Sequence, residues 1–496
     1  MTGCCARLYR ALPVAAFVAL AGCATPPAAP PADDSLASRC ARAYAALDAE
    51  VDAAGVRDAA AARIAGFPAL RATRFLASFA TPALDGAAFD AWLAQLAAED
   101  RRARLHEIAN LPPEPTRRAR AALAAEGFGA LAPQAFLDGC SSTLAQRDAA
   151  DPQLRAALVA GARVPDDYDD VARALGAYPL ARVVAAAAIR NYERGVVEAF
   201  AAQRDARPRT AYVPPPAPLA PAQVRAIVER GRADPLGIPA LDAADAERLL
   251  ATFAPVLAVE ERGGDDRIGR PVHAQGGVGF APVPVVFGRV THTRFAGATH
   301  VQLVYTAWFA ARSSAHPGDP LAGALDGVMW RVTLDRDGAP LVYDSIHACG
   351  CYALFVATPR VVARPRQDTL DEQALVPASL PAHDAGARVA IELDGGTHYL
   401  RGVRLLDAPP AGAIRYAIAD DDALRSLALP AGGTRSLYGP DGIVAGTERG
   451  ERALFWPLGI RDAGAMRQWG RHATAFVGRR HFDDAFLLDR YFVPAR

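Results

Sequence analysis

The stretch VMWRVTLDRDGAPLVYDSI, residues 328–346, decides the fold of the C-terminal half of this chain. Its two ends, 328–334 and 340–346, are rich in β-branched and aromatic residues, which favour strands. The five residues between them, DRDGA, include Gly338, and glycine supplies the positive φ that a hairpin loop of this length needs. The stretch therefore predicts two antiparallel strands joined by a tight loop.

Runs of the same character surround this hairpin. The segments 301–309, 387–393 and 397–406 predict further strands, interrupted by Gly, Pro and Asp. Helical patterns are fewer in this half, with one at 243–253 and a short one at 462–472. We therefore expect an α+β domain over residues 224–496, built on a largely antiparallel sheet with a few helices.

The N-terminal half is rich in alanine and helical in period. Phe89, Trp92, Leu93 and Leu96 fall at i, i+3, i+4 and i+7, and Asp85 precedes them as a candidate N-cap. The run LARVVAAAAI at 180–189 is too short to span a bilayer and predicts a buried helix. The fold class is thus α+β, with a helical domain over residues 35–203 before the sheet domain. A proline-rich linker over residues 204–223 separates the two.

The first residues have the order of a secretory signal. Arg7 and Arg10 precede a short apolar run that ends in Leu20-Ala21-Gly22-Cys23. This tetrapeptide resembles the lipobox of bacterial lipoproteins, in which the signal peptidase cuts before a cysteine that carries a diacylglycerol. The resemblance implies a signal peptide over residues 1–22, a lipid on Cys23 and, because Ala24 follows, sorting to the outer membrane. Residues 23–34 would then be a lipidated, proline-rich tether to that membrane.

The charge balance excludes some function classes. Removing residues 1–22 takes away two of the 54 basic residues and none of the 54 acidic ones, which leaves a nearly neutral chain. Such a chain has no long-range attraction to nucleic acid, so we expect no nucleic-acid partner. All the basic residues are arginine, which excludes a P-loop lysine and a Schiff-base lysine.

Four cysteines remain in the exported part of the chain once Cys4 and Cys5 leave with the signal peptide and Cys23 is lipidated. An oxidising compartment favours disulfides. Because Cys40 and Cys140 both lie in the helical domain, we predict that they pair and close a loop of about 100 residues.

The other two cysteines belong to the stretch DSIHACGCY, residues 344–352. If this stretch is extended, His347, Cys349 and Cys351 face one side of the sheet and could bind a metal ion that accepts nitrogen and sulfur ligands, such as zinc or Cu(I). His300 or His398 would supply the fourth ligand. Two alternatives remain open: a strained, exchange-active disulfide that Gly350 permits, and buried side chains without a chemical role.

Three further patterns are weaker. Asp344, Ser345 and His347 have the residue types of a catalytic triad, but alternate facing separates the aspartate from the other two. The acidic run at 164–170 lacks the spacing of a calcium loop and favours a helix start. The arginine-rich run at 467–482 is a candidate anion or glycan site, or a set of intramolecular ion pairs.

No complete catalytic constellation results from these patterns. The sequence therefore predicts an outer-membrane lipoprotein that acts as a binding or assembly module, with a membrane partner through its lipid. Two alternatives stay open: a metal-dependent hydrolase that uses the His-x-Cys-x-Cys set with an open water position, and a thiol–disulfide redox module.

Overall fold

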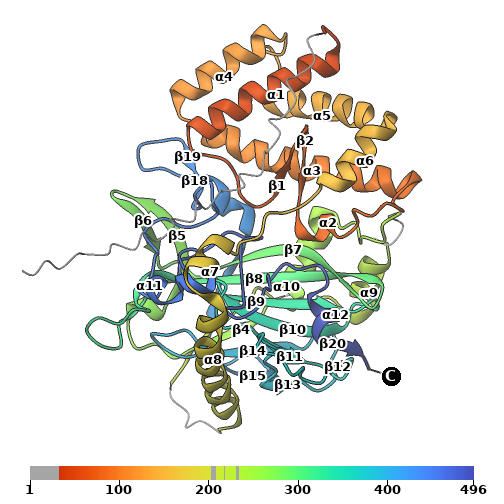
Figure 1. The fold of residues 1–496 in the computed structure, drawn as a ribbon. Helices are drawn as coiled ribbons and strands as arrows, with labels where there is room; N and C mark the ends of the chain where they lie inside the picture. Colours follow the sequence, from red (N-terminus) through yellow and green to blue (C-terminus); the bar gives the residue numbers. More distant parts are fainter. Residues whose placement is uncertain (1–32, 203–207, 217, 231–233, 496) are drawn as a thin grey trace, which may run out of the picture.

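A computed structural model describes residues 33–202, 208–216, 218–230 and 234–495. The predicted signal peptide, Cys23 and nearly all of the tether lie outside these residues. The α+β fold class is confirmed: helices dominate the N-terminal half, and mainly antiparallel sheets dominate the C-terminal half (Figure 1).

The N-terminal part consists of six helices and a small hairpin, and its core forms two apolar clusters. The predicted stripe on α3 is confirmed, because Phe89, Trp92, Leu93 and Leu96 are all buried. Asp85 directly precedes this helix, but its side chain makes no capping hydrogen bond. The elements are α1 (Leu36–Ala53), β1 (Ala62–Ile64), β2 (Phe67–Ala72), α2 (Arg74–Ala77), α3 (Gly86–Asn110), α4 (Pro113–Ala125), α5 (Pro133–Ala150) and α6 (Pro152–Gly161).

The predicted disulfide is present. Cys40 of α1 and Cys140 of α5 are bonded, with their Cα atoms 5.3 Å apart. Both are buried in the apolar cluster that also contains Tyr44, Leu137 and Leu144. The bond therefore closes a loop that includes most of the helical part.

The largest sheet has nine strands and contains the predicted hairpin. β9 and β10 are antiparallel, with Val332 opposite Tyr343, and Gly338 in the loop between them has a φ of +82°. From one edge inward the strand order is β13-β11-β10-β9-β8. Strand β8 pairs with both β7 and β5; β7 also pairs with β17, and β5 also pairs with β6. The strands are β5 (Ile268–Ala274), β6 (Gly277–Ala281), β7 (Val285–Phe295), β8 (Ala298–Arg312), β9 (Gly323–Leu334), β10 (Pro340–His347), β11 (Leu354–Ala357), β13 (Ala378–Ser379) and β17 (Ala417–Asp420).

Part of the segment predicted as a linker, residues 204–223, belongs to a second sheet, which has five strands. Residues Thr210–Val213 form β3, which pairs with β4 and β16, because this short β-branched and aromatic run has sheet partners on both sides. The described part of 204–223 is therefore built into the C-terminal core instead of separating two domains. The other strands of this sheet are β4 (Val256–Val259), β14 (Arg388–Leu393), β15 (Leu400–Leu406) and β16 (Ile414–Arg415).

Short elements complete the C-terminal part. The predicted helix over 462–472 is wrong: this segment consists of turns, and Gly464 and Gly470 both have a φ of +86°, which a helix excludes. The remaining elements are α9 (Pro221–Arg230), α10 (Ala243–Phe253), η2 (Gly264–Asp266), β12 (Val361–Ala363), η3 (Asp421–Ser426), β18 (Leu427–Ala428), β19 (Thr434–Arg435), α11 (Arg452–Phe455), η4 (Trp456–Leu458), α12 (Leu487–Tyr491) and β20 (Phe492–Pro494).

Helices α7 (Asp170–Leu175) and α8 (Tyr178–Ala201) pack against the C-terminal part, on β15 and η4, although composition grouped them with the N-terminal helices. The prediction that 180–189 is buried is wrong. Leu180, Val183 and Val184 are 73%, 51% and 74% exposed. Within the described residues, no helix is long and apolar enough to cross a membrane.

Buried ion pairs join the two halves of the molecule. Asp58, after α1, accepts a hydrogen bond from Arg425 of η3 at 2.8 Å, and both side chains are buried. Arg74 of α2 pairs with Asp483, which precedes α12, at 3.1 Å. Because buried charges need their partners, these contacts fix the N-terminal helices on the sheet domain.

Candidate functional site

The predicted ligands His347, Cys349 and Cys351 lie in a turn. β10 ends at His347, whose N–H donates to the carbonyl of Cys351 at 2.9 Å, and the N–H of Gly350 donates to the carbonyl of His347 at 2.8 Å. Gly350 has a φ of +94°, and a Cβ there would lie 2.4 Å from the carbonyl oxygen of Ala473. Only glycine fits this position, so the alternation expected of an extended strand is lost.

Cys349 and Cys351 are free and buried. Both belong to an apolar cluster that includes Phe287, Trp308 and Met466. The hydrogen bond with Cys349 and burial raise the pKa of the Cys351 thiol well above its usual value. Since the thiolate is the reactive form, this environment suits core side chains and does not favour thiol–disulfide exchange.

His300 lies far from the other predicted ligands. It is near the start of β8, and its Nδ1 donates to the carbonyl of Leu334 at 3.0 Å. His398 instead stacks on Phe309, nine positions further along β8, which corresponds to about 30 Å of strand. In the part of the chain that the structure describes, no three His, Cys, Asp or Glu side chains are grouped so that they could hold a metal ion. The predicted zinc ligands are therefore not assembled there.

His347 and His398 are nevertheless brought together by a shared carboxylate. His347 Nδ1 lies 3.3 Å from Asp326 Oδ1, and His398 Nδ1 lies 2.8 Å from Asp326 Oδ2. His398 Nε2 lies 3.3 Å from Asp266 Oδ1 on its other side. We call Asp266, His398, Asp326 and His347 the acid–imidazole chain; all four are buried.

Local structure fixes both carboxylates of this chain. Asp266, at the end of η2, accepts hydrogen bonds from the backbone N–H groups of Arg262 and Gly263 at 2.7 and 3.0 Å. It also accepts one from Gly396, in the loop that carries His398 between β14 and β15. Asp326 lies on β9 and accepts from the N–H of the next residue, Gly327, at 2.9 Å. These hydrogen bonds fix the positions of the two carboxylates on either side of His398.

The neighbours set the protonation of each member. Burial acts to raise the pKa of Asp326, but His347 and His398 outweigh it and hold this pKa well below its usual range. Burial acts to lower the pKa of His398, but Asp266 and Asp326 outweigh it and raise this pKa. Burial prevails at His347, whose pKa is lowered. The two carboxylates therefore favour the charged form of His398, whereas burial favours the neutral form of His347.

The neutral His347 leaves one acceptor without a partner. Its Nδ1–H points to the Asp326 carboxylate, which can only accept, so Nε2 carries a lone pair. This atom is buried and has no hydrogen-bond partner among the described residues. A carboxylate, an imidazole and a free Nε2 form the arrangement of a base oriented by an acid.

Two tyrosines separate this base from a cavity. The rings of Tyr352 and Tyr399 lie 4.8 and 5.8 Å from the His347 ring. Arg312 donates to both hydroxyl oxygens, at 3.2 Å for Tyr352 and 2.9 Å for Tyr399. Because a guanidinium only donates, both hydroxyl hydrogens stay available for another acceptor. The tyrosines can therefore present donors to a bound molecule.

The α8 cavity lies between α8 and the sheet domain and has a volume of about 350 Å³. One wall is a stripe at helical spacing on α8: Ala185, Ala188, Ile189 and Tyr192. Apolar side chains of other segments continue the walls, and Cys351, Tyr352, Tyr399 and Glu451 also line the cavity. Apolar walls with a few polar groups are typical of small-molecule sites.

Glu451 is the most perturbed acid in this cavity. Burial raises its pKa to about 7, against the opposing charges of Arg312 and Arg449. Among the described residues, no hydrogen bond to its carboxylate contributes to this shift. An acid that changes protonation near neutral pH inside a cavity is a candidate functional group. No motif around residue 451 marked this glutamate in the sequence.

The two polar segments weighed from the sequence bind each other. Asp166 and Asp170, from the acidic run, both pair with Arg479, and Asp167 pairs with Arg471 at 2.8 Å. Asp169 caps α7 by accepting from the N–H groups of its first turn at 2.8 and 2.9 Å. These arginines therefore already have intramolecular partners.

Comparisons with known proteins give no assignment. No family model, no curated protein and no solved structure matches this chain.

Proposed function

We propose that this protein is an envelope lipoprotein, held to the outer membrane by a lipid on Cys23, that acts as a binding module with the α8 cavity as its ligand site. The observation that supports this most is the combination of apolar walls with Tyr352, Tyr399 and Glu451 in one cavity. A fitting ligand has an apolar body and a polar group that accepts hydrogen bonds from the tyrosines.

The chemistry of the cavity favours binding over hydrolysis. Cys351 lines it as a protonated thiol, and the described residues hold no group of metal ligands. An activated nucleophile needs a lowered pKa, an adjacent base or a metal. Among the described residues, the cavity therefore offers neither a group of metal ligands for the hydrolase alternative nor a reactive thiolate for the redox alternative.

The outer face of the same helix supports a role in assembly. Leu180, Val183 and Val184 point outward from α8, and Leu175 of α7 is 77% exposed. Exposed apolar patches of this kind mark interaction sites. The helix that covers the cavity is thus also the element that a partner would contact.

A second candidate function uses the same cavity. Glu451 lines the cavity and, with a pKa of about 7, has the properties of a general acid or base there, whereas His347 lies behind Tyr352 and Tyr399. Incubation with a bound ligand separates the two functions, because a binding module returns the ligand unchanged and an enzyme converts it.

The anchor is tested by replacing its cysteine. We expect the native chain to sediment with membranes after cell lysis and the Cys23→Ala chain to remain in the supernatant, because the lipid would be the main attachment. Cell fractionation followed by immunoblotting measures this. A Cys23→Ala chain that still sediments would contradict the lipid anchor.

The cavity is tested by filling it. Ala185→Trp places an indole in the α8 cavity, whereas Ala187→Trp makes the same change on the exposed side of the same helix. We expect titration with the neutral apolar dye N-phenyl-1-naphthylamine to show one binding site fewer in Ala185→Trp, because the dye and the indole compete for one volume. Ala187→Trp should retain all sites. Equal stoichiometry in both variants would contradict the cavity as a ligand site.

A further inference from the structure

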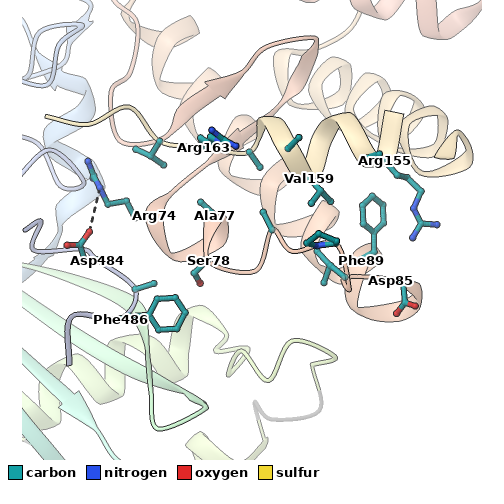
Figure 2. Close-up of a pocket in the computed structure, with 18 of the residues that line it drawn as sticks. Arg74, Ala77, Ser78, Asp85, Phe89, Arg155, Val159, Arg163, Asp484 and Phe486 are labelled. Atoms are coloured by element: carbon teal, nitrogen blue, oxygen red, sulfur yellow. Dashed lines mark ion pairs between the residues drawn. The ribbon is translucent and has the colours of Figure 1, made fainter. Parts of the chain in front are cut away.

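A second and larger cavity lies between the helical part and the C-terminal segment. Its volume is about 1210 Å³, and it is lined by α2, the start of α3, the end of α6 and residues 484–490. We call it the interdomain groove. Figure 2 shows its side chains, with Arg74 and Asp484 at one end and Arg155, Phe89 and Asp85 at the other.

Much of the groove surface is apolar. Leu84 contributes from the segment before α3, Val159 from α6 and Phe486 from the C-terminal segment. Phe486 is 48% exposed, although it is large and apolar. An exposed aromatic ring in a concave apolar surface is a site that a ligand can cover.

The arginines that line the groove differ in whether they have a charged partner among the described residues. Arg74 is neutralised, since it forms ion pairs with Asp167 and Asp483 at 2.8 and 3.1 Å. Arg155 lies over the Phe89 ring at 4.3 Å and has no ion pair with a described residue, and neither has Arg163. A free guanidinium prefers a carboxylate or phosphate, so the groove lacks the anion that these side chains suit.

The acids of the groove do not supply this anion. Asp484 lies 3.9 Å from Arg74 and also accepts from the N–H of His481. Asp85 is exposed and forms no ion pair with Arg155. The groove is thus lined by more arginines than aspartates. Its two aspartates, Asp85 and Asp484, face four arginines: Arg74, Arg155, Arg163 and Arg490.

We propose that the interdomain groove binds an anionic amphiphile, a molecule with one apolar chain and a carboxylate head. Arg155 or Arg163, which lie apart along the groove in Figure 2, would hold the head, and the apolar surface with Phe486 would hold the chain. A peptide added as a strand fits less well, because none of the lining residues belongs to a strand whose edge could pair with it. This site is separate from the α8 cavity and does not depend on its function.

The test is a fluorescence titration of the full chain carrying Cys23→Ala with a dansylated undecanoic acid. We expect Arg155→Gln combined with Arg163→Gln to weaken binding of this probe by about tenfold or more, the effect of losing charged hydrogen bonds. The methyl ester of the probe should bind both chains equally, because it lacks the charge. Phe486→Ala should weaken acid and ester alike.

Two matched variants control for the loss of an arginine elsewhere and for binding of the probe in the α8 cavity. Arg120→Gln removes an exposed arginine of α4 that lines neither cavity, and it should leave the affinity unchanged. Ala185→Trp, which fills the α8 cavity, should also leave it unchanged. The proposal would be overturned if the acid bound equally well to the chain that carries only Cys23→Ala and to the chain that also carries Arg155→Gln and Arg163→Gln. Loss of probe binding in Ala185→Trp would place the probe in the α8 cavity and overturn it as well.

Discussion

Replacing Cys40 and Cys140 with alanine should lower the free energy of unfolding of the helical part by about 4 to 5 kcal/mol, according to the chain-entropy model for a loop of this length. The disulfide joins α1 to α5 across a sequence separation of 100 residues. Without it, the unfolded chain gains the conformations that the closed loop excludes. Alanine is preferred to serine because both sites are buried among apolar side chains, where an unpaired hydroxyl adds its own cost.

Urea denaturation with and without dithiothreitol measures this effect. The oxidised native chain should have the highest midpoint, and reduction should lower it to the midpoint of the Cys40→Ala/Cys140→Ala chain. That variant should not respond to the reductant, because Cys349 and Cys351 form no disulfide. Hydrogen exchange should show the loss of protection in α1 and α5. An unchanged midpoint in the variant would mean that the bond does not constrain the unfolded chain.

The features that the sequence predicted best depend on local patterns or on the composition of one region of the chain. The hairpin of β9 and β10 follows from two strand-forming runs and a glycine at the loop. The stripe of α3 follows from helical spacing, and the Cys40–Cys140 pair follows from the position of both cysteines in the alanine-rich, helical half of the chain. None of these requires knowledge of which distant segments meet.

Helix α8 shows where such signals fail. The run at 180–189 is apolar except for Arg182, and this composition is typical of a buried helix. In the structure it covers the α8 cavity with Ala185, Ala188 and Ile189, and it exposes Val183 and Val184 on its outer side. Composition cannot distinguish two apolar faces with different surroundings, because the packing of the C-terminal part decides which of them is covered.

The sequence predicted only some residues of the acid–imidazole chain and the α8 cavity, because their partners are distant in the sequence. His347 and His398 were singled out by residue type, but their common partner Asp326 lies 21 and 72 residues away from them in the sequence. The partners depend on sheet register and on the loop that Asp266 fixes, neither of which a local pattern contains. The turn at Gly350 places Cys349 and Cys351 outside the acid–imidazole chain. Glu451 lines the α8 cavity but belongs to a segment that contains no motif.

The buried histidine His472 should make the stability of this protein sensitive to acid. It lies beside the turn after β10, where its Nε2 donates to the carbonyl of Ala348 at 3.2 Å. Burial lowers its pKa to about 3, with a further contribution from Arg467 and a small opposing one from Asp483. The folded chain therefore keeps His472 neutral at pH values where the unfolded chain, with a pKa of about 6.5, already binds a proton.

The sign of the effect follows from this difference in proton binding. A folded-state pKa below the unfolded value gives stability that is fully present above pH 6.5 and is lost as the pH falls toward 3. Each pH unit in this window costs about 1.4 kcal/mol, so about 3 kcal/mol is lost between pH 6.5 and 4.5. His292, whose pKa burial lowers to about 4, acts in the same direction. Glu451 acts in the opposite direction, because its pKa of about 7 lets the folded chain take up a proton first.

The contribution of His472 is therefore best isolated by comparing variants. His472→Gln retains a donor for the Ala348 carbonyl and cannot take up a proton, so its stability relative to the native chain should rise by about 3 kcal/mol as the pH falls from 6.5 to 4.5. Urea denaturation at a series of pH values measures this difference, and His316→Gln, at an exposed histidine, is the matched control. Parallel pH curves for native and His472→Gln chains would show that His472 is protonated in the folded state. In that case the turn that carries His347, Cys349 and Cys351 would have to accommodate a charge beside Arg467, which its burial and its hydrogen bond to Ala348 do not favour.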